Sequence, residues 1–249
     1  MKKPILIALG IVLFAAAQAQ LIGPLLSGKH AAPALWSIVT FTLSGACVTS
    51  SNSCSITSLN TTAGHLVVFG MTNGAGNHIS SVTLPISGGN IFCFGCAGGI
   101  FTSCFVTDAA TSFTSDCGYT FGVTTSSGTT FTIVRDTIAT AGWRVWYAEL
   151  AKSTGCTISL DAVGTRDQTT NSTSPIGVTL SIAGPSDAIV QEVGVGSGVT
   201  AVTSPYSTNF LHGGTQGVAL SINTSSGAPP TWTVTNNKSA LSGIAFKCL

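Results

Sequence analysis

The sequence carries very little charge. Lysine, arginine, aspartate and glutamate make up 7% of its 249 residues, and the formal net charge is +1, whereas about 25% of the residues of an average soluble protein are charged. Nucleic-acid binding needs a basic patch that neutralises phosphates, and no cluster of lysine and arginine is present. We therefore expect no nucleic-acid partner. The low charge leaves little repulsion between molecules, so self-association is permitted.

Helical patterns and catalytic motifs are also lacking. No stretch after the N-terminal segment shows a capped helical period of apolar residues, and the segment 196–198 lacks the spacing of a G-x-S-x-G nucleophile elbow. The four histidines form no closely spaced ligand pair: His30, His65, His78 and His212. The sequence thus predicts no catalytic residue, no metal and no cofactor.

The N-terminus has the three parts of a secretory signal peptide. Lys2 and Lys3 precede an apolar run over 4–16, and Ala17-Gln18-Ala19 supplies a small-x-small cleavage site. The alternative is an uncleaved anchor, but the run is shorter than the roughly 20 residues that span a bilayer. We therefore expect residues 1–19 to be removed, and the protein to be secreted or extracytoplasmic with no membrane attachment.

Eight cysteines fit an oxidising compartment, where an even number is expected to pair. Cys47 and Cys54 bracket a turn-rich loop and are expected to bond. Cys156 and Cys248 would be joined by a second bond. The remaining four are expected to pair among themselves: Cys93, Cys96, Cys104 and Cys117.

The spacing Cys93-Phe-Gly-Cys96 resembles a redox C-x-x-C motif. Redox chemistry would need a following helix to lower the pKa of the thiol, and 97–100 indicates a turn instead. A zinc site with Cys104 and Cys117 is a second alternative, but the spacing of that pair is too wide for a standard zinc site. Structural disulfides are the preferred interpretation.

Periodic apolar residues predict strands. Alternation with a period of two indicates strands with one buried face over 176–182, 216–222 and 231–235. Segments apolar on both faces indicate central strands over 66–69, 131–134, 143–150 and 188–190. Short strands separated by turn signals predict an all-β, antiparallel β-sandwich. We expect one domain over 20–249, with a cysteine-rich lobe near 86–118.

The order of features resembles secreted bacterial jelly-roll sandwiches of the concanavalin-like and laminin-G-like kind. The resemblance covers residues 36–247 and rests on the phrase at 60–68, the aromatic strand at 143–150 and the closing segment at 232–246. It implies a jelly-roll fold and a role in carbohydrate binding, adhesion or structure. It assigns no functional residue.

The aromatic strand carries the candidate ligand contacts. Trp143, Trp146 and Tyr147 could stack on a sugar, and Glu149 lies beside them. Because Trp143 and Trp146 differ in parity along the strand, they point to opposite faces. One of them could face a ligand, or both faces could be packed.

The leading hypothesis is a secreted, non-enzymatic protein acting in adhesion, surface structure or carbohydrate binding, with an extracellular glycan or cell-surface material as its partner. A glycan-active hydrolase that uses Glu149 and a second carboxylate is one alternative, and a self-assembling fibre or coat subunit is another. Glu192 is expected to be a polar strand residue, and a calcium site at Asp167 and Asn171 is disfavoured against a solvated turn. Glycosylation sequons occur at Asn60, Asn171, Asn223 and Asn237.

Overall fold

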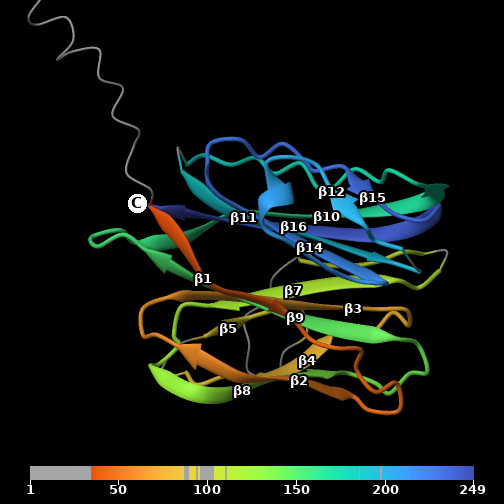
Figure 1. Ribbon diagram of the computed structural model, residues 1–249, viewed down its shortest axis with the longest axis horizontal. Helices are drawn as coiled ribbons and strands as arrows, with labels where there is room; N and C mark the ends of the chain where they lie inside the picture. Colours follow the sequence, from red (N-terminus) through yellow and green to blue (C-terminus); the bar gives the residue numbers. More distant parts are fainter. Residues whose placement is uncertain are drawn as a thin grey trace, which may run out of the picture. The chain divides into compact units, whose positions relative to one another are not determined.

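Figure 1 shows a computed structural model of the protein, which describes residues 35–249 except 87–89, 94, 96–103, 110, 185 and 197. The segment Ala34–Leu249 forms one compact unit. The expected signal peptide, residues 1–19, lies outside the described residues. No helix in the described part of the chain is long and apolar enough to cross a membrane.

Antiparallel strands build almost all of the described chain, which confirms the all-β prediction; its helical content is one 3-10 turn, η1 (Tyr206–Thr208). The N-terminal half (residues 36–152) forms two sheets. The inner N-terminal sheet contains β1 (Trp36–Leu43), β3 (Leu66–Asn73), β5 (Ile91–Phe92), β6 (Phe105–Thr107), β7 (Thr114–Thr120) and β9 (Trp143–Lys152). Their order is β1-β9-β3-β7-β5, with β6 also paired to β7.

The outer N-terminal sheet covers the other side of this half. It contains β2 (Ser53–Thr61), β4 (Ile79–Thr83) and β8 (Ser126–Arg135), in the order β2-β8-β4. Strands β1 to β4 therefore alternate between the two sheets along the chain. This alternation buries both faces of β3 and β9, as predicted for the doubly apolar segments 66–69 and 143–150.

The C-terminal half (residues 158–248) repeats the plan. The inner C-terminal sheet contains β10 (Ile158–Ser172), β11 (Asp187–Val195), β13 (Phe210–Gly213), β14 (Gln216–Thr224) and β16 (Asn237–Cys248), in the order β10-β16-β11-β14-β13. A two-stranded ribbon of β12 (Ala201–Val202) and β15 (Trp232–Thr233) covers its outer face.

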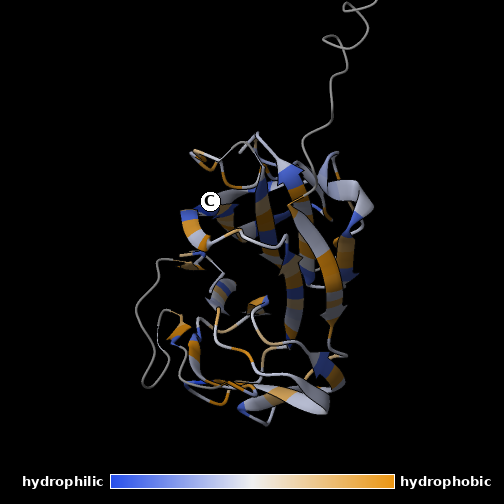
Figure 2. Ribbon diagram, turned by 90° about the vertical axis from the view of Figure 1, so that its left-hand side faces the viewer, coloured by the Kyte–Doolittle hydropathy of each residue, from blue (hydrophilic) through white to orange (hydrophobic). Residues whose placement is uncertain are grey.

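These four sheets of the described chain lie in layers, with the two inner sheets facing each other (Figure 1). Three apolar cores separate the layers. The N-terminal core includes Phe69 and Phe131, the middle core between the inner sheets includes Trp146 and Phe246, and the C-terminal core includes Trp232. Along many strands, orange apolar residues alternate with paler or blue ones (Figure 2), the pattern expected where the faces of a strand differ.

Two of the expected one-sided strands differ from the prediction. β14 is buried on both faces, because the outer ribbon covers the side opposite the middle core. Residues 177–182 form no ladder strand, although Val178 and Leu180 are buried as expected. The side chain of Gln191 takes the place of a neighbouring strand: its Oε1 accepts the Val178 amide at 3.0 Å and its Nε2 donates to the Val178 carbonyl at 2.7 Å.

Three disulfides join described cysteines, and all three agree with the expected pairing. They are Cys47–Cys54, Cys104–Cys117 and Cys156–Cys248, with Cα–Cα distances of 5.5, 5.3 and 5.4 Å. Cys93 is also disulfide-bonded, and Cys96 lies outside the described residues. The bonds indicate an oxidising environment. The segment proposed as a cysteine-rich lobe contains β7, which is an interior strand of the inner N-terminal sheet.

Candidate functional site

The candidate ligand contacts on β9 lie inside the protein. Trp143, Trp146, Tyr147 and Glu149 are each at most 1% exposed. Because sheets pack on both faces of β9, side chains of both parities are covered: Trp143 and Tyr147 in the N-terminal core and Trp146 in the middle core. Of the two alternatives, both faces of the strand are packed, and these aromatics form no exposed surface.

Glu149 accepts hydrogen bonds from the turn that precedes β3. Its Oε1 lies 2.9 Å from the Thr62 amide and 2.6 Å from His65 Nδ1, and the Tyr147 hydroxyl donates to Oε2 at 3.5 Å. Burial raises the pKa of Tyr147 above its usual value, and the Glu149 carboxylate raises it further. The carboxyl therefore fixes the turn to the inner N-terminal sheet.

His65 and Glu149 have the arrangement of a histidine oriented by a buried acid. The His65 side chain is 20% exposed, whereas that of Glu149 is fully buried. Such a pair can act as a general base when a serine, threonine or cysteine lies against the other ring nitrogen. Among the described residues, Glu149 is the side chain hydrogen-bonded to the ring, and no hydroxyl or thiol completes a triad.

Glu192, expected as a polar strand residue, lies at the centre of a polar network between the inner sheets. Trp146 Nε1 and Gln216 Nε2 donate to its Oε1 at 2.7 and 2.8 Å. The hydroxyls of Ser115 and Ser242 lie 2.8 and 3.4 Å from its Oε2. The four partners come from both inner sheets, so this one side chain joins the two halves of the molecule.

Two features of the surroundings shape this network. A Cβ atom on Gly70 would lie 2.6 Å from Trp146 Nε1, so only glycine lets the indole cross β3 to reach Glu192. Burial raises the pKa of Glu192 to about 8; its hydrogen-bond donors reduce this effect and the nearby Asp116 adds to it. The carboxyl is therefore mostly protonated at neutral pH.

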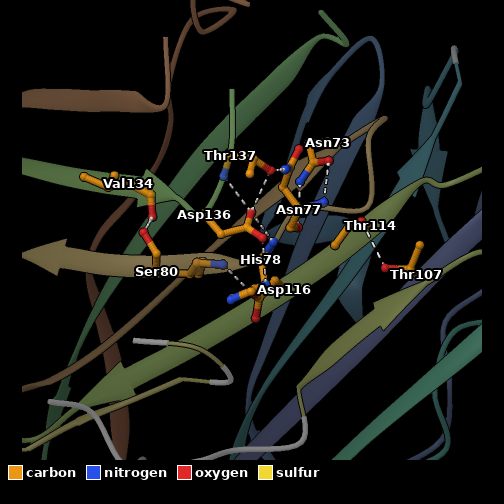
Figure 3. Close-up of polar contacts among 11 residues, drawn as sticks. Asn73, Asn77, His78, Ser80, Thr107, Thr114, Asp116, Val134, Asp136 and Thr137 are labelled. Carbon is orange, nitrogen blue, oxygen red and sulfur yellow. Dashed lines mark hydrogen bonds and ion pairs between the residues drawn. The ribbon is translucent and has the colours of Figure 1, made fainter. Parts of the chain in front are cut away.

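Asp116 lies on β7, below the loop that enters β4 (Figure 3). Its Oδ2 accepts the Ile79 amide at 2.7 Å, while its buried Oδ1 has no hydrogen-bond partner. Burial raises the pKa of Asp116 to about 8, against the lowering effect of the Ile79 amide, and Asp136 raises it further. Above Asp116, His78 Nδ1 lies 3.2 Å from Asp136 Oδ2 in a partly exposed ion pair.

A third group of acids lies at the start of β11. Burial and the neighbouring Asp161 raise the pKa of Asp187 to about 7. Neither oxygen of Asp187 meets a donor, so a hydrogen bond between the two carboxyls requires a proton on one of them. Asp161 keeps its charge: burial acts against it, but the Ala183 amide at 2.6 Å and Lys247 at 3.0 Å hold its pKa below the usual value.

The described residues contain no group of three or more histidine, cysteine or acidic side chains that could hold a metal ion. The segment expected as a solvated turn around Asp167 and Asn171 is part of β10, paired with β16. Asp167 Oδ2 accepts the Ala109 amide at 3.3 Å.

A pocket of about 160 Å³ opens at one end of the interface between the inner sheets. It lies where β3 and β11 end and where β7, β9 and β14 begin. Its lining is entirely uncharged: Thr72, Asn73, Gly74, Phe113, Ala141, Gly142, Gly194, Val195, Gly196 and Thr215. None of these residues was singled out from the sequence. Their positions range from 72 to 215, and no local spacing marks glycines and threonines that meet only in the fold.

Comparison of the chain with protein-family models, with curated proteins and with solved structures finds no match.

Proposed function

We propose that this chain is exported by a signal peptide at residues 1–19 and acts outside the cytoplasm as a non-enzymatic, jelly-roll-type protein. It contacts neutral glycans on a cell surface or in an extracellular matrix, in adhesion or surface structure. One observation carries this proposal: the acids with strongly raised pKa values are enclosed between layers. Glu192, Asp116 and Asp187 are each at most 1% exposed. Glu192 and Asp116 bond to neighbouring strands, and none of the three side chains is exposed to a substrate.

The composition supports the same function. A surface with few charges that is rich in serine, threonine and asparagine matches the hydroxyl groups of neutral polysaccharides. The three disulfides suit a protein that persists outside the cell.

The test is retention of the mature chain, residues 20–249, on immobilised neutral and acidic polysaccharides. The protein is produced in an oxidising compartment so that its disulfides form. We expect retention on at least one neutral polysaccharide and no release of reducing ends over a long incubation. Steady release of reducing ends, or passage through every column without delay, would contradict the proposal.

A second candidate is a glycan-active hydrolase that uses Glu149, which lies 2.6 Å from the partly exposed ring of His65. Glu149→Gln keeps the shape of the acid but removes its charge. Hydrolytic activity that this variant loses, while a Glu192→Gln variant retains it, would establish the hydrolase in place of the binding protein.

The edge strand β10 favours a third candidate, a self-assembling subunit. It is 15 residues long, and β16 is its ladder partner within the described sheets, so its other backbone edge is available for pairing. Light scattering over a concentration series tests this candidate: growth of scattering with concentration supports assembly, and a constant monomer mass excludes it.

A further inference from the structure

The pocket at the end of the inner-sheet interface contains a polar group without a hydrogen-bond partner. Thr72 lines the pocket, is 2% exposed, and its hydroxyl has no partner among the described residues. Buried polar atoms are almost always satisfied by protein, water or ligand. An unpartnered hydroxyl in the wall of a pocket indicates that a hydroxyl-bearing molecule completes the site.

The wall of the pocket is partly aromatic, and one of its polar side chains is bonded into the adjoining loop. Asn73 is turned away toward Asn77 (Figure 3): it donates from Nδ2 to the Asn77 carbonyl at 2.9 Å, and its Oδ1 accepts the Ala75 amide at 2.8 Å. Its amide therefore fixes the loop. Phe113 supplies an apolar ring, held so closely that a Cβ on Gly196 would lie 2.8 Å from it.

Charge and size restrict the ligand. No lysine, arginine or acid lines the pocket, so phosphates, nucleotides and metal ions would find no counter-charge there. Its volume of about 160 Å³ is well below the roughly 300–1,000 Å³ of sites for drug-sized ligands. A compact neutral molecule with hydroxyls on its edge and C–H groups on its face fits both the Thr72 hydroxyl and the Phe113 ring.

We propose that this pocket binds a single ring of a neutral sugar, with the Thr72 hydroxyl meeting a ring hydroxyl and Phe113 packing on the ring face. The inference rests on the proposed glycan-binding function and names the part of the molecule that performs it.

The chain offers a matched pair of variants. A Cβ on Gly142, which lines the pocket, and a Cβ on Gly45, which does not, would each meet no atom within 4 Å, and neither residue has a positive φ. Gly142→Leu therefore adds a bulky side chain beside the pocket at a position with room for its Cβ, and Gly45→Leu is its control. Thr72→Val removes the unpartnered hydroxyl and keeps the shape, so it should leave thermal stability unchanged or raise it.

The experiment titrates the mature chain with free glucose, galactose, mannose and N-acetylglucosamine, followed by ligand-observed and protein-observed NMR. We expect at least one sugar to bind, with affinity about 10-fold weaker or lost in Gly142→Leu and unchanged in Gly45→Leu. Thr72→Val should weaken binding by about 3- to 10-fold, the worth of one hydrogen bond.

Equal sugar affinity in the wild type and Gly142→Leu would overturn the inference, as would the absence of binding by all four sugars. Polysaccharide retention separates this failure from failure of the proposed function. If Gly142→Leu is retained on the polysaccharide as the wild type is, the pocket assignment is wrong while the function stands. If the wild type binds neither polysaccharide nor free sugar, both are wrong.

Discussion

Each half of the molecule pairs a large inner sheet with a small outer one, but the disulfides of the two halves enclose segments of very different length. In the N-terminal half, Cys47–Cys54 and Cys104–Cys117 span 7 and 13 residues. In the C-terminal half, Cys156–Cys248 spans 92 residues and encloses every strand from β10 to β16. Short bonds link neighbouring segments of the first half, although its strands pair over long stretches of chain, as in Trp36 opposite Lys152. One long-range bond joins the ends of the second half.

The outer layers of the two halves also differ in the hydrogen bonds that hold them. A three-stranded sheet, whose two ladders contain register shifts, covers the N-terminal half. The C-terminal half is covered by a two-stranded ribbon and by residues 177–182, whose backbone bonds to Pro230 and Gly227 and, at Val178, to the Gln191 amide. Similar layers can therefore be built with strand ladders or with irregular segments in which a buried side chain supplies part of the backbone bonding.

Removing disulfides should give the largest difference between the halves. Replacing Cys156 and Cys248 by serine should lower the free energy of unfolding by roughly 4–5 kcal/mol, and replacing Cys47 and Cys54 by about 2 kcal/mol, because a longer closed loop restricts the unfolded chain more. Urea unfolding of the two double variants measures both values. Equal losses would show that loop length does not distinguish the halves.

The next largest loss of stability is expected from the Asn223 side chain, whose hydrogen bonds join the two halves. Asn223 Oδ1 accepts the amides of Leu35 and Trp36 at 2.8 and 2.9 Å, and its Nδ2 donates to the Trp36 carbonyl at 2.9 Å. Asn223→Ala should cost about 2–3 kcal/mol, from the lost bonds and from a φ of 56° that alanine adopts poorly. Asn60→Ala is the control, because Asn60 makes one exposed bond, to Gly128. Thermal unfolding that ranks Asn60 above Asn223 would contradict the assignment.

Substitutions of two tryptophans on β9 test whether the interface between the halves contributes more stability than the interior of one half. Trp146 donates to Glu192 across the middle core, and Trp143 donates to the Val48 carbonyl at 3.1 Å within the N-terminal half. Trp146→Phe should cost about 2 kcal/mol and Trp143→Phe about 1 kcal/mol, since the first leaves a fully buried acceptor with fewer donors. Chemical denaturation of both variants tests the order, and the reverse order would show that the network adds little.

The interface should also make stability depend on pH. Glu192 and Asp116 have pKa values of about 8 in the folded protein, against ordinary values of 4.5 and 3.8. At pH values between the ordinary pKa values and about 8, these two carboxyls have lost their protons in the unfolded chain but still hold them in the folded chain. Each group therefore favours folding most at low pH, and the free energy of unfolding should fall by about 1 kcal/mol per pH unit and group as pH rises toward 8.

Glu192→Gln should make this pH dependence shallower and raise stability at pH 8 relative to the wild type. Melting temperatures between pH 5 and pH 9 provide the measurement. A variant whose slope equals that of the wild type would exclude Glu192 as a source of the pH dependence.

The sequence predicted the strand content because side-chain alternation and doubly apolar runs are local properties. The segments 66–69, 143–150 and 188–190 are interior strands as expected. The bonds Cys47–Cys54 and Cys156–Cys248 were also expected, and Cys104–Cys117 lies within the group of four cysteines expected to pair among themselves. Burial of Val178 and Leu180 was correct as well. Their lack of ladder bonds was not predictable, because Gln191 replaces a neighbouring strand and a sequence pattern does not show which polar side chains will be buried.

The candidate site was less predictable for a related reason. Trp143 and Trp146 were recognised as pointing to opposite faces, but alternation does not show how many layers are stacked on a strand. The extra layer turned a possible ligand surface into two cores. The His65–Glu149 pair and the lining of the pocket each combine residues that are distant in sequence. Nothing in one sequence indicates that such residues will be neighbours in the fold.

The position of β16 has a consequence for the timing of assembly. This strand lies between β10 and β11 in the inner C-terminal sheet but follows both along the chain. Synthesis proceeds at roughly 5–20 residues per second, so on the order of several seconds pass between the appearance of β10 and that of β16. During this interval β10 lacks its partner and the apolar face of β11 is uncovered. The C-terminal half must therefore be kept from aggregating while it waits for residues 237–248.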